Sequence, residues 1–211
     1  IPHAIFVNKI DSAKGRIRDL LEALQPLSSA PLIARQIPIR EGDAITGFVD
    51  LALERAFHYQ PGKPSTQIDI PESLTERETS ERFHMLEQLA DHDDALLEQL
   101  LMDEIPDIQT IFKDLVAETR AGLVVPVMFG SALNGFGVRR LLKMLRHEAP
   151  GASDTARRLG TNGSSVQIFK IANGGSVGRL ALARILGDGL AEGAELIAGD
   201  GEAVRAGALF S

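Results

Sequence analysis

The sequence predicts an α/β fold in which a parallel sheet is interrupted by a long insertion and followed by a separate antiparallel β region. A unit of strand, loop and helix occurs at residues 5–24 and recurs at residues 123–145. Between the two copies, residues 31–122 carry strand and helix patterns of their own. The composition then changes, since residues 160–211 hold 11 of the 20 glycines and no proline.

The first strand is the apolar run Ile5-Phe-Val7, which leads into the polar residues Asn8, Lys9 and Asp11. Continuous apolar runs are typical of strands in the middle of a parallel sheet, and open α/β sheets bind ligands at the carboxyl ends of such strands. Apolar residues spaced three and four apart then predict a helix up to Leu24, which the following prolines close.

The second copy of this unit begins with the buried strand Leu123–Phe129, which delivers Gly130-Ser131-Ala132 to a loop. A closing helix is predicted from Val138 to Leu145 by the same apolar spacing. Because both strands belong to one predicted parallel sheet, their loops are expected at the same edge of that sheet.

The insertion is expected to form a small sheet followed by acidic helices. Its predicted elements are strands over 31–39, 46–51 and 55–59, a proline-containing loop over 61–71, and helices over 72–103 and 108–120. Asp91-His-Asp-Asp94 is expected to interrupt the first helix, because Asp93 or Asp94 can cap a second one.

Past Pro150, short β-type runs predict the beginning of an antiparallel barrel or sandwich. The runs cover residues 165–171, 180–186 and 194–198, with hairpin signals at Asp188-Gly189 and Asp200-Gly201. Gly151–Gly160 reads as the linker to this region. The chain starts at Ile1 without an initiator methionine and stops inside a strand-like run, so we expect it to be part of a longer protein.

The composition excludes several classes of protein. The 211 residues are 44% hydrophobic, enough for one large or two ordinary globular cores. No stretch approaches the ~20 apolar residues of a membrane span, and no secretion signal is present, so no membrane partner is expected. The absence of cysteine excludes disulfides and thiolate metal sites, which fits a cytoplasmic protein.

The net charge of -7 is distributed unevenly along the chain. Residues 72–107 hold 12 acidic and 2 basic side chains, which favours a solvated helix face over a docking site. The basic cluster Arg139–Arg158 favours a helix face and linker, with a contact to an RNA backbone as the alternative. His84 and His92 lie eight residues apart, which is not the three- or four-residue spacing of two metal ligands on one helix.

The loop residues match the chemistry of guanine. Guanine presents a carbonyl acceptor and two adjacent N–H donors, and the single carboxylate of Asp11 can accept from both donors. Asn8 can bond the base edge and tie the loops together, and the stem of Lys9 can lie along the base. Ser131-Ala132 could offer a backbone N–H to the guanine carbonyl. The alternative is an ordinary turn in which Asp11 or its neighbour Ser12 caps the next helix.

These residues resemble the translational GTPases, and elongation factor G in particular. Asn8-Lys-Ile-Asp11 matches the guanine-specificity motif Asn-Lys-x-Asp, and Gly130-Ser131-Ala132 matches the Ser-Ala motif. Thr46–Leu51 is similar to part of the subdomain inserted in that family. Phe169-Lys-Ile171 with Gly178-Arg-Leu180 resembles the start of the family's second, barrel domain.

The resemblance implies the C-terminal part of a P-loop GTPase domain with an inserted α+β subdomain, followed by the start of an antiparallel β-barrel domain. It assigns residues 1–30 and 123–150 to the GTPase domain, 31–122 to the inserted subdomain, 151–163 to a linker and 164–211 to the incomplete barrel. It also implies GTP or GDP as the ligand, with Mg²⁺ in the full-length parent, and the ribosome as the partner through ribosomal RNA and the stalk protein.

Parts of the family pattern are missing. No G-x-x-x-x-G-K-[ST] phosphate loop occurs, since Gly62-Lys-Pro-Ser65 lacks the first glycine and a strand-to-helix context, and no Asp-x-x-Gly is present. Catalytic residues and metal ligands are therefore expected outside the chain, which should not hydrolyse GTP alone. Tyr59–Ser65 and Arg146–Pro150 also depart from the family, which indicates an elongation factor G-like paralogue.

The sequence thus predicts a fragment of a GTP-binding translation factor that recognises guanine through Asn8, Lys9, Asp11, Ser131 and Ala132. Two other functions stay open. The parent could be a GTPase of related architecture that works off the ribosome, or the chain could be a protein-interaction module that is independent of nucleotide.

Overall fold

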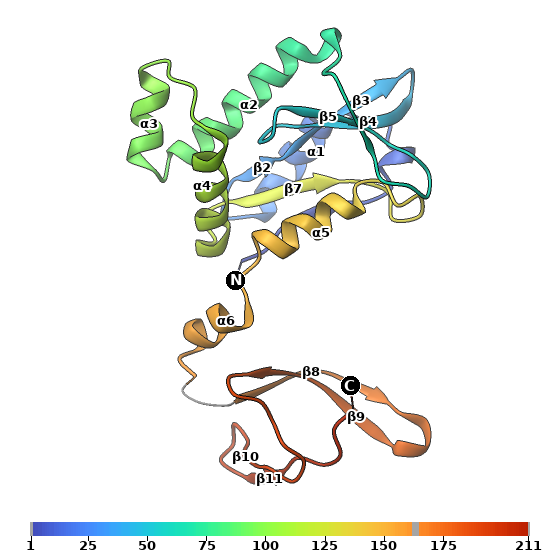
Figure 1. The fold of residues 1–211 in the computed structure, drawn as a ribbon, viewed down its shortest axis with the longest axis vertical. Helices are drawn as coiled ribbons and strands as arrows, with labels where there is room; N and C mark the ends of the chain where they lie inside the picture. Colours follow the sequence, from blue (N-terminus) through green and yellow to red (C-terminus); the bar gives the residue numbers. More distant parts are fainter. Residues whose placement is uncertain (1, 162–164, 211) are drawn as a thin grey trace. The chain divides into compact units, whose positions relative to one another are not determined.

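The structure of the protein is a computed structural model that describes residues 2–161 and 165–210. The chain divides into two compact units, Ile1–Ala149 and Pro150–Ser211 (Figure 1). It is a mixed α/β protein with one small parallel sheet and several antiparallel sheets, as the fold class of the sequence predicts in outline. No helix in the described ranges is both long enough and apolar enough to cross a membrane.

The parallel sheet of the first unit has the strand order β1-β7-β2, so that strands distant in sequence are neighbours. Its strands are β1 (Ile5–Val7), β7 (Val125–Phe129) and β2 (Leu32–Ala34). All five residues of β7 are buried, as expected for a central strand between two neighbours. The predicted helices are present as α1 (Ile17–Leu24) and α5 (Val138–His147).

The antiparallel sheet of the first unit has the order β3-β4-β5-β6. Its strands are β3 (Gln36–Glu41), β4 (Ala44–Asp50), β5 (Arg55–His58) and β6 (Thr66–Ile68). The sequence prediction of a loop over 61–71 was wrong in part, because β6 pairs with β5 at the edge of this sheet.

The single strand predicted over 31–39 is in fact two strands in two different sheets. Its first half, β2, pairs with β7, although it lies in the range expected for the insertion. The chain changes sheets at Arg35, whose N–H donates to Val127 O in the parallel sheet at 3.0 Å. The carbonyl of Arg35 accepts from Leu51 N at 3.1 Å, at the end of β4. The two sheets therefore share one residue of backbone.

Three helices follow the antiparallel sheet, namely α2 (Thr75–Ala90), α3 (Asp94–Leu101) and α4 (Ile108–Ala121). The predicted interruption is confirmed, since Asp93 caps α3 by accepting from Ala95 N at 2.9 Å and Leu96 N at 3.0 Å. Asp107 caps α4 in the same way, and Gly122 ends it with a φ of 75°. Short 3₁₀ helices cover Ile10–Ser12, Gln25–Leu27, Glu72–Leu74 and Gly175–Val177.

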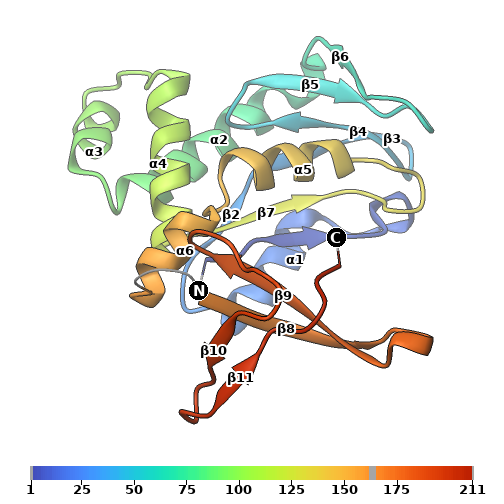
Figure 2. The same cartoon turned by 60° about the horizontal axis from the view of Figure 1, so that its bottom comes forward.

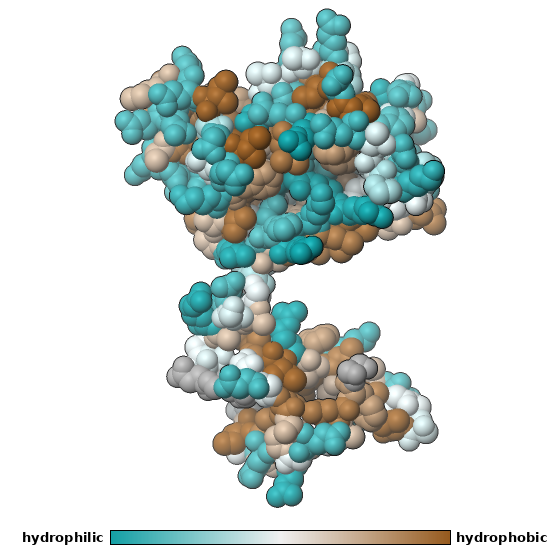
Figure 3. All heavy atoms as spheres, viewed as in Figure 1, coloured by the Kyte–Doolittle hydropathy of each residue, from teal (hydrophilic) through white to brown (hydrophobic). Residues whose placement is uncertain are grey.

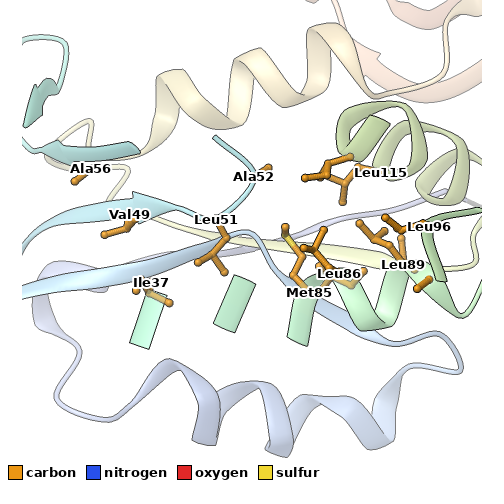
Figure 4. Packing of buried hydrophobic residues seen from close by; sticks show 14 of the residues in the cluster. Ile37, Val49, Leu51, Ala52, Ala56, Met85, Leu86, Leu89, Leu96 and Leu115 are labelled. Carbon is orange, nitrogen blue, oxygen red and sulfur yellow. The ribbon is translucent and has the colours of Figure 1, made fainter. Parts of the chain in front are cut away.

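The largest core of the first unit joins the antiparallel sheet to these helices (Figure 4). Leu51 from the end of β4 and Leu89 from α2 are fully buried in it, together with Leu115 from α4. Arg82 of α2 is also buried, and its guanidinium donates to Leu51 O at 2.6 Å. The predicted apolar stripe is confirmed in part, since Leu86, Leu89 and Leu96 are buried in this core whereas Phe83, Leu97 and Leu101 are exposed. Most carboxylates of residues 72–121 are exposed, with a few buried exceptions.

Glu118 of α4 is the most unusual of these exceptions. Glu118 is only 5% exposed. Within the described ranges, neither of its carboxylate oxygens has a hydrogen-bond partner. Burial raises the pKa of Glu118 to about 8, and the neighbouring carboxylates of Asp114 and Asp93 act in the same direction. Glu118 is therefore held in the fold as a neutral acid.

We expect the stability of the first unit to fall as the pH rises from about 4.5, the ordinary value for glutamate, to about 8. Below this window Glu118 is protonated in both the folded and the unfolded chain, and above it the fold must bury a charge. The loss approaches ~1.4 kcal/mol per pH unit inside the window. Urea unfolding of Glu118→Gln, which stays neutral, should show a flatter pH profile and higher stability at pH 8. The exposed Glu98→Gln is the matched control, and an identical slope in both variants would remove Glu118 as the cause.

The second unit begins with helix α6 (Ala152–Leu159), inside the range that the sequence predicted as a linker. The helix starts where Gly151 N donates to Asp154 Oδ2 at 3.0 Å, and it ends at Gly160. None of its residues is buried.

In the described part of the second unit, the β structure consists of two hairpins. Its strands are β8 (Ser165–Asn173), β9 (Arg179–Leu186), β10 (Glu195–Ile197) and β11 (Ala203–Arg205), paired as β8-β9 and β10-β11 (Figure 2). Asp200-Gly201 lies in the turn between β10 and β11, as predicted. Asp188-Gly189 does not form a hairpin turn, because the strand before it, β9, pairs with the earlier strand β8. Apolar side chains of β8 are exposed, and Phe169 is 64% exposed.

Candidate functional site

The two predicted loops leave the same edge of the parallel sheet. Strands β1 and β7 are parallel neighbours whose last residues, Val7 and Phe129, are paired in register. Gly130 N donates to Val7 O at 3.0 Å, and Ile10 N donates to Gly130 O at 3.0 Å. The backbone pairing of the two strands thus continues past their ends and places residues 8–11 beside residues 130–132.

Asn8 joins the two loops through its side chain. Its Oδ1 accepts from Lys9 N at 2.8 Å and from Ala132 N at 2.9 Å, across 124 residues of sequence. Lys9 has a left-handed backbone with a φ of 61°, and this turn sends the next residue, Ile10, into the core, where it is 0% exposed. Asn8, Lys9 and Asp11 stay exposed on either side of this anchor.

Ser131 lies beneath the exposed carboxylate of Asp11. Ser131 is 1% exposed, and its hydroxyl accepts from Asn134 Nδ2 at 3.2 Å. The Ser131 hydroxyl holds the pKa of the Asp11 carboxyl below its usual value, with Ser12 and Lys9 contributing in the same direction. Asp11 is therefore ionised at neutral pH and is an acceptor only. Two carboxylate oxygens offer about four acceptor positions, so these hydroxyls leave capacity for a ligand.

Gly130 lets the backbone at the start of the second loop lie close to the Phe136 carbonyl and the Phe6 ring. A Cβ atom at this position would lie 2.1 Å from Phe136 O and 2.7 Å from the ring of Phe6. Because neither a backbone carbonyl nor a packed ring can give way by so much, only glycine fits. Ser131 N then donates to Phe136 O at 2.9 Å, which closes the second loop into a tight turn.

An aromatic stack supports the loops from below, and the sequence did not predict it. The rings of Tyr59 and Phe136 are parallel, with centroids 4.5 Å apart, and Phe48 lies against Tyr59 at 5.6 Å. Tyr59 and Phe48 are 3% exposed and pack in the same cluster as Ile10. The sequence nevertheless carried a signal for this stack. Phe57 and Tyr59 occupy alternate positions of a predicted strand, so their side chains point to the same face of the sheet.

This geometry changes two expectations from the sequence, the free backbone N–H at Ser131-Ala132 and the helix cap at Asp11 or Ser12. The N–H groups of Ser131 and Ala132 are both bonded within the protein, so a contact from Ala132 to a base requires Asn8 Oδ1 to give up that bond. The alternative role of Asp11 or Ser12 as a helix cap is wrong, because α1 begins at Ile17 and its N-cap is Arg16. The two residues lie instead in the short 3₁₀ helix after Lys9.

Among the described residues, no group of three or more histidine, cysteine, aspartate or glutamate side chains is placed to hold a metal ion. His84 Nδ1 lies 3.7 Å from Glu87 Oε2, one turn further along α2, and both side chains are more than half exposed.

Comparisons with known proteins give this geometry a context. No protein-family model matches the chain. The elongation factor G-like protein of Synechocystis is 44% identical over 189 residues, which cover 88% of this chain and 28% of that protein. Elongation factor G 2 of Desulfotalea psychrophila is 30% identical over 176 residues, which cover 82% of this chain and 25% of that protein.

This chain is homologous to elongation factor G. A crystal structure from Thermus thermophilus has a similar fold, with a TM-score of 0.80 and 27% identity over 98% of this chain and 30% of that one. The chain thus spans less than a third of the length of these two relatives and of the protein from Thermus thermophilus.

Proposed function

We propose that this chain is part of an elongation factor G-like GTP-binding translation factor, in which it recognises guanine and provides surfaces that face the ribosome. In this proposal, residues 1–30 and 123–150 are the C-terminal part of a P-loop GTPase domain, 31–122 are its inserted α+β subdomain, 151–163 are a linker, and 164–211 begin a β-barrel domain. The homology to elongation factor G over most of the chain supports this assignment.

One observation carries the guanine proposal, namely the bond from Ala132 N to Asn8 Oδ1 that holds the two loops at one sheet edge. It keeps the Asp11 carboxylate beside the second loop, where this side chain is exposed to solvent. Asp11 would accept from the ring N–H and the amino group of guanine, which adenine cannot offer in that arrangement. The stem of Lys9 would cover one face of the base.

Ser131 has a positioning role in this proposal. Its hydroxyl is buried and faces the Asp11 carboxyl, so it orients the carboxylate and does not reach the base itself. Ala132 is exposed, and its N–H would pass from Asn8 to the guanine carbonyl when a base is present. The second loop therefore supplies one orienting hydroxyl and one backbone donor.

The phosphates and Mg²⁺ would be held by residues outside this chain, because the sequence contains no phosphate loop. GTP binding and hydrolysis in the whole protein would then switch its hold on the ribosome, in the cytoplasm, through contacts to ribosomal RNA and the stalk protein. Alone, the chain should bind GDP weakly and should not hydrolyse GTP, because base contacts account for only a part of nucleotide affinity.

The ribosomal function can be tested by co-sedimentation of the full-length protein with ribosomes. We expect it to pellet with ribosomes in the presence of a non-hydrolysable GTP analogue and to stay in the supernatant with GDP. Binding that is equal in both nucleotides would favour the interaction module. GTP hydrolysis without any ribosome binding would favour a GTPase that works elsewhere.

A further inference from the structure

A pocket with a basic rim lies in the first unit where helix α5 begins, against strands β4 and β5. Its volume is about 210 Å³. The basic side chains that line it are Lys63, from the loop before β6, and Arg139, Arg140 and Lys143, from the first turns of α5. We call this cavity the basic pocket. Gly135, from the turn that follows Ser131-Ala132, also lines it, but none of the residues proposed to contact guanine does.

The positive charge of the basic pocket is mostly uncompensated. Arg140 pairs with Asp50 at 2.6 Å, and Asp50 is fully buried, so this ion pair belongs to the fold. In the described parts of the chain, Lys63, Arg139 and Lys143 have no acidic partner, and no carboxylate lines the pocket. Arg139 and Lys143 are four residues apart on one helix, where like charges repel each other. An anion between them would remove this repulsion.

The backbone at the start of α5 adds to this charge. Gly137, which lines the basic pocket, is the N-cap of the ten-residue helix and has a φ of 72°. No side chain caps the helix, so its first-turn N–H groups have no side-chain acceptor. The positive end of the helix dipole therefore lies beside the three cations, and both favour a negative ligand.

The floor of the basic pocket is apolar. Phe48 and Phe57 line it with stacked rings whose centroids lie 5.1 Å apart. These rings accept no conventional hydrogen bond from the ammonium and guanidinium groups on the rim. Ser65 adds one hydroxyl to the lining, and water or a ligand can supply further acceptors. Hydrophilic side chains gather on the surface over α5 (Figure 3), so that a ligand would meet charged groups first.

We propose that the basic pocket binds a phosphate group through Lys63, Arg139 and Lys143 at the start of α5. Phosphate suits this site because its oxygens accept several charge-assisted hydrogen bonds at once, from a planar guanidinium and from two ammonium groups. The phosphate could come from the backbone of single-stranded RNA or from a free phosphate compound. The side chains proposed to bind phosphate differ from those proposed to contact guanine, so the two sites can be tested separately.

The test measures two probes on the whole 211-residue chain, a fluorescent 12-nucleotide single-stranded RNA and inorganic pyrophosphate. At low salt we expect binding of RNA whose affinity falls with salt, with a logarithmic slope of about -0.7, because the pocket neutralises one phosphate of the strand. Arg139→Gln with Lys143→Gln should weaken binding at least tenfold and bring the slope close to zero. Lys63→Gln, in a different element, should also weaken binding, by less than the double variant.

Arg146→Gln is the matched control, because Arg146 carries the same charge on the same helix, is exposed, and does not line the basic pocket. Circular dichroism of each variant checks that the fold is kept. Binding of RNA without binding of pyrophosphate assigns the phosphate to a nucleic acid backbone, and binding of pyrophosphate without binding of RNA assigns it to a free phosphate compound. Competition between the two probes shows that both bind through the basic pocket. The proposal is overturned if neither probe binds, or if Arg146→Gln weakens binding as much as the double variant.

Discussion

Asp11→Asn in the full-length protein is expected to lower the affinity for GDP by about 10²- to 10⁴-fold. The carboxylate is proposed to accept two hydrogen bonds from guanine, and a bond to a charged group contributes ~1.5–3 kcal/mol. The amide also places an N–H₂ donor opposite a donor of the base, which adds repulsion. Equilibrium titration with a fluorescent GDP analogue measures the change.

The same variant should gain affinity for xanthosine diphosphate, whose carbonyl at position two accepts from an amide. This reversal separates a base contact from a general loss of structure, because an unfolded loop would bind neither nucleotide. Asp19→Asn is the control, since Asp19 is a solvent-exposed partner of Arg16 on α1. Unchanged GDP affinity in Asp11→Asn would remove Asp11 from the site.

Arg35→Met is expected to destabilise the first unit by about 3–5 kcal/mol, because it leaves a buried carboxylate without a partner. Arg35 and Glu148 are 1% and 2% exposed, and their side chains meet at 2.7 Å. The guanidinium also lies 5.7 Å from the ring of Phe112, so some packing is lost as well. A whole domain is stable by only ~5–15 kcal/mol, which makes this loss large.

Urea unfolding of the first unit measures this effect, and a double variant isolates its cause. Arg35→Met with Glu148→Met removes both charges and should recover most of the lost stability, because apolar replacements of a buried pair are often neutral. Arg16→Met removes an arginine from an exposed pair and should cost less than ~1 kcal/mol. If Arg35→Met lowers the free energy of unfolding as little as Arg16→Met does, the Glu148 carboxylate is not left buried and unpaired in that variant.

The regular elements of the first unit could be predicted because the sequence signals for them are local. The apolar runs before Asn8 and before Gly130 both mark strands, and Asp93 and Gly122 mark helix ends by their own chemistry. The central position expected for the first run is wrong for the described sheet, because β1 is half-buried at its edge and β7 is the central strand. The proximity of the two loops also followed from these strands, since parallel neighbours end at one edge.

Other features could not be predicted because they depend on contacts between distant residues. The alternation over 31–39 is continuous through Arg35, and only the pairing of its N–H and carbonyl to different sheets divides it. Strand β6 is exposed and is fixed by β5 alone. The burial of Ser131 and the ring stack of Tyr59 on Phe136 likewise arise only when the insertion folds against the loops.

The sharing of Arg35 between the two sheets has a consequence for the order in which the chain folds. Strand β2 lies immediately before Arg35, but its partner β7 comes after the whole of the insertion. The bond from Phe129 N to Gln36 Oε1 joins residues 93 apart in sequence. Closing so long a loop is costly until the intervening segment has become compact, and contacts of this kind form slowly. We expect the antiparallel sheet and its helices to fold early, so that the sheet edge carrying Asn8 and Asp11 is completed last.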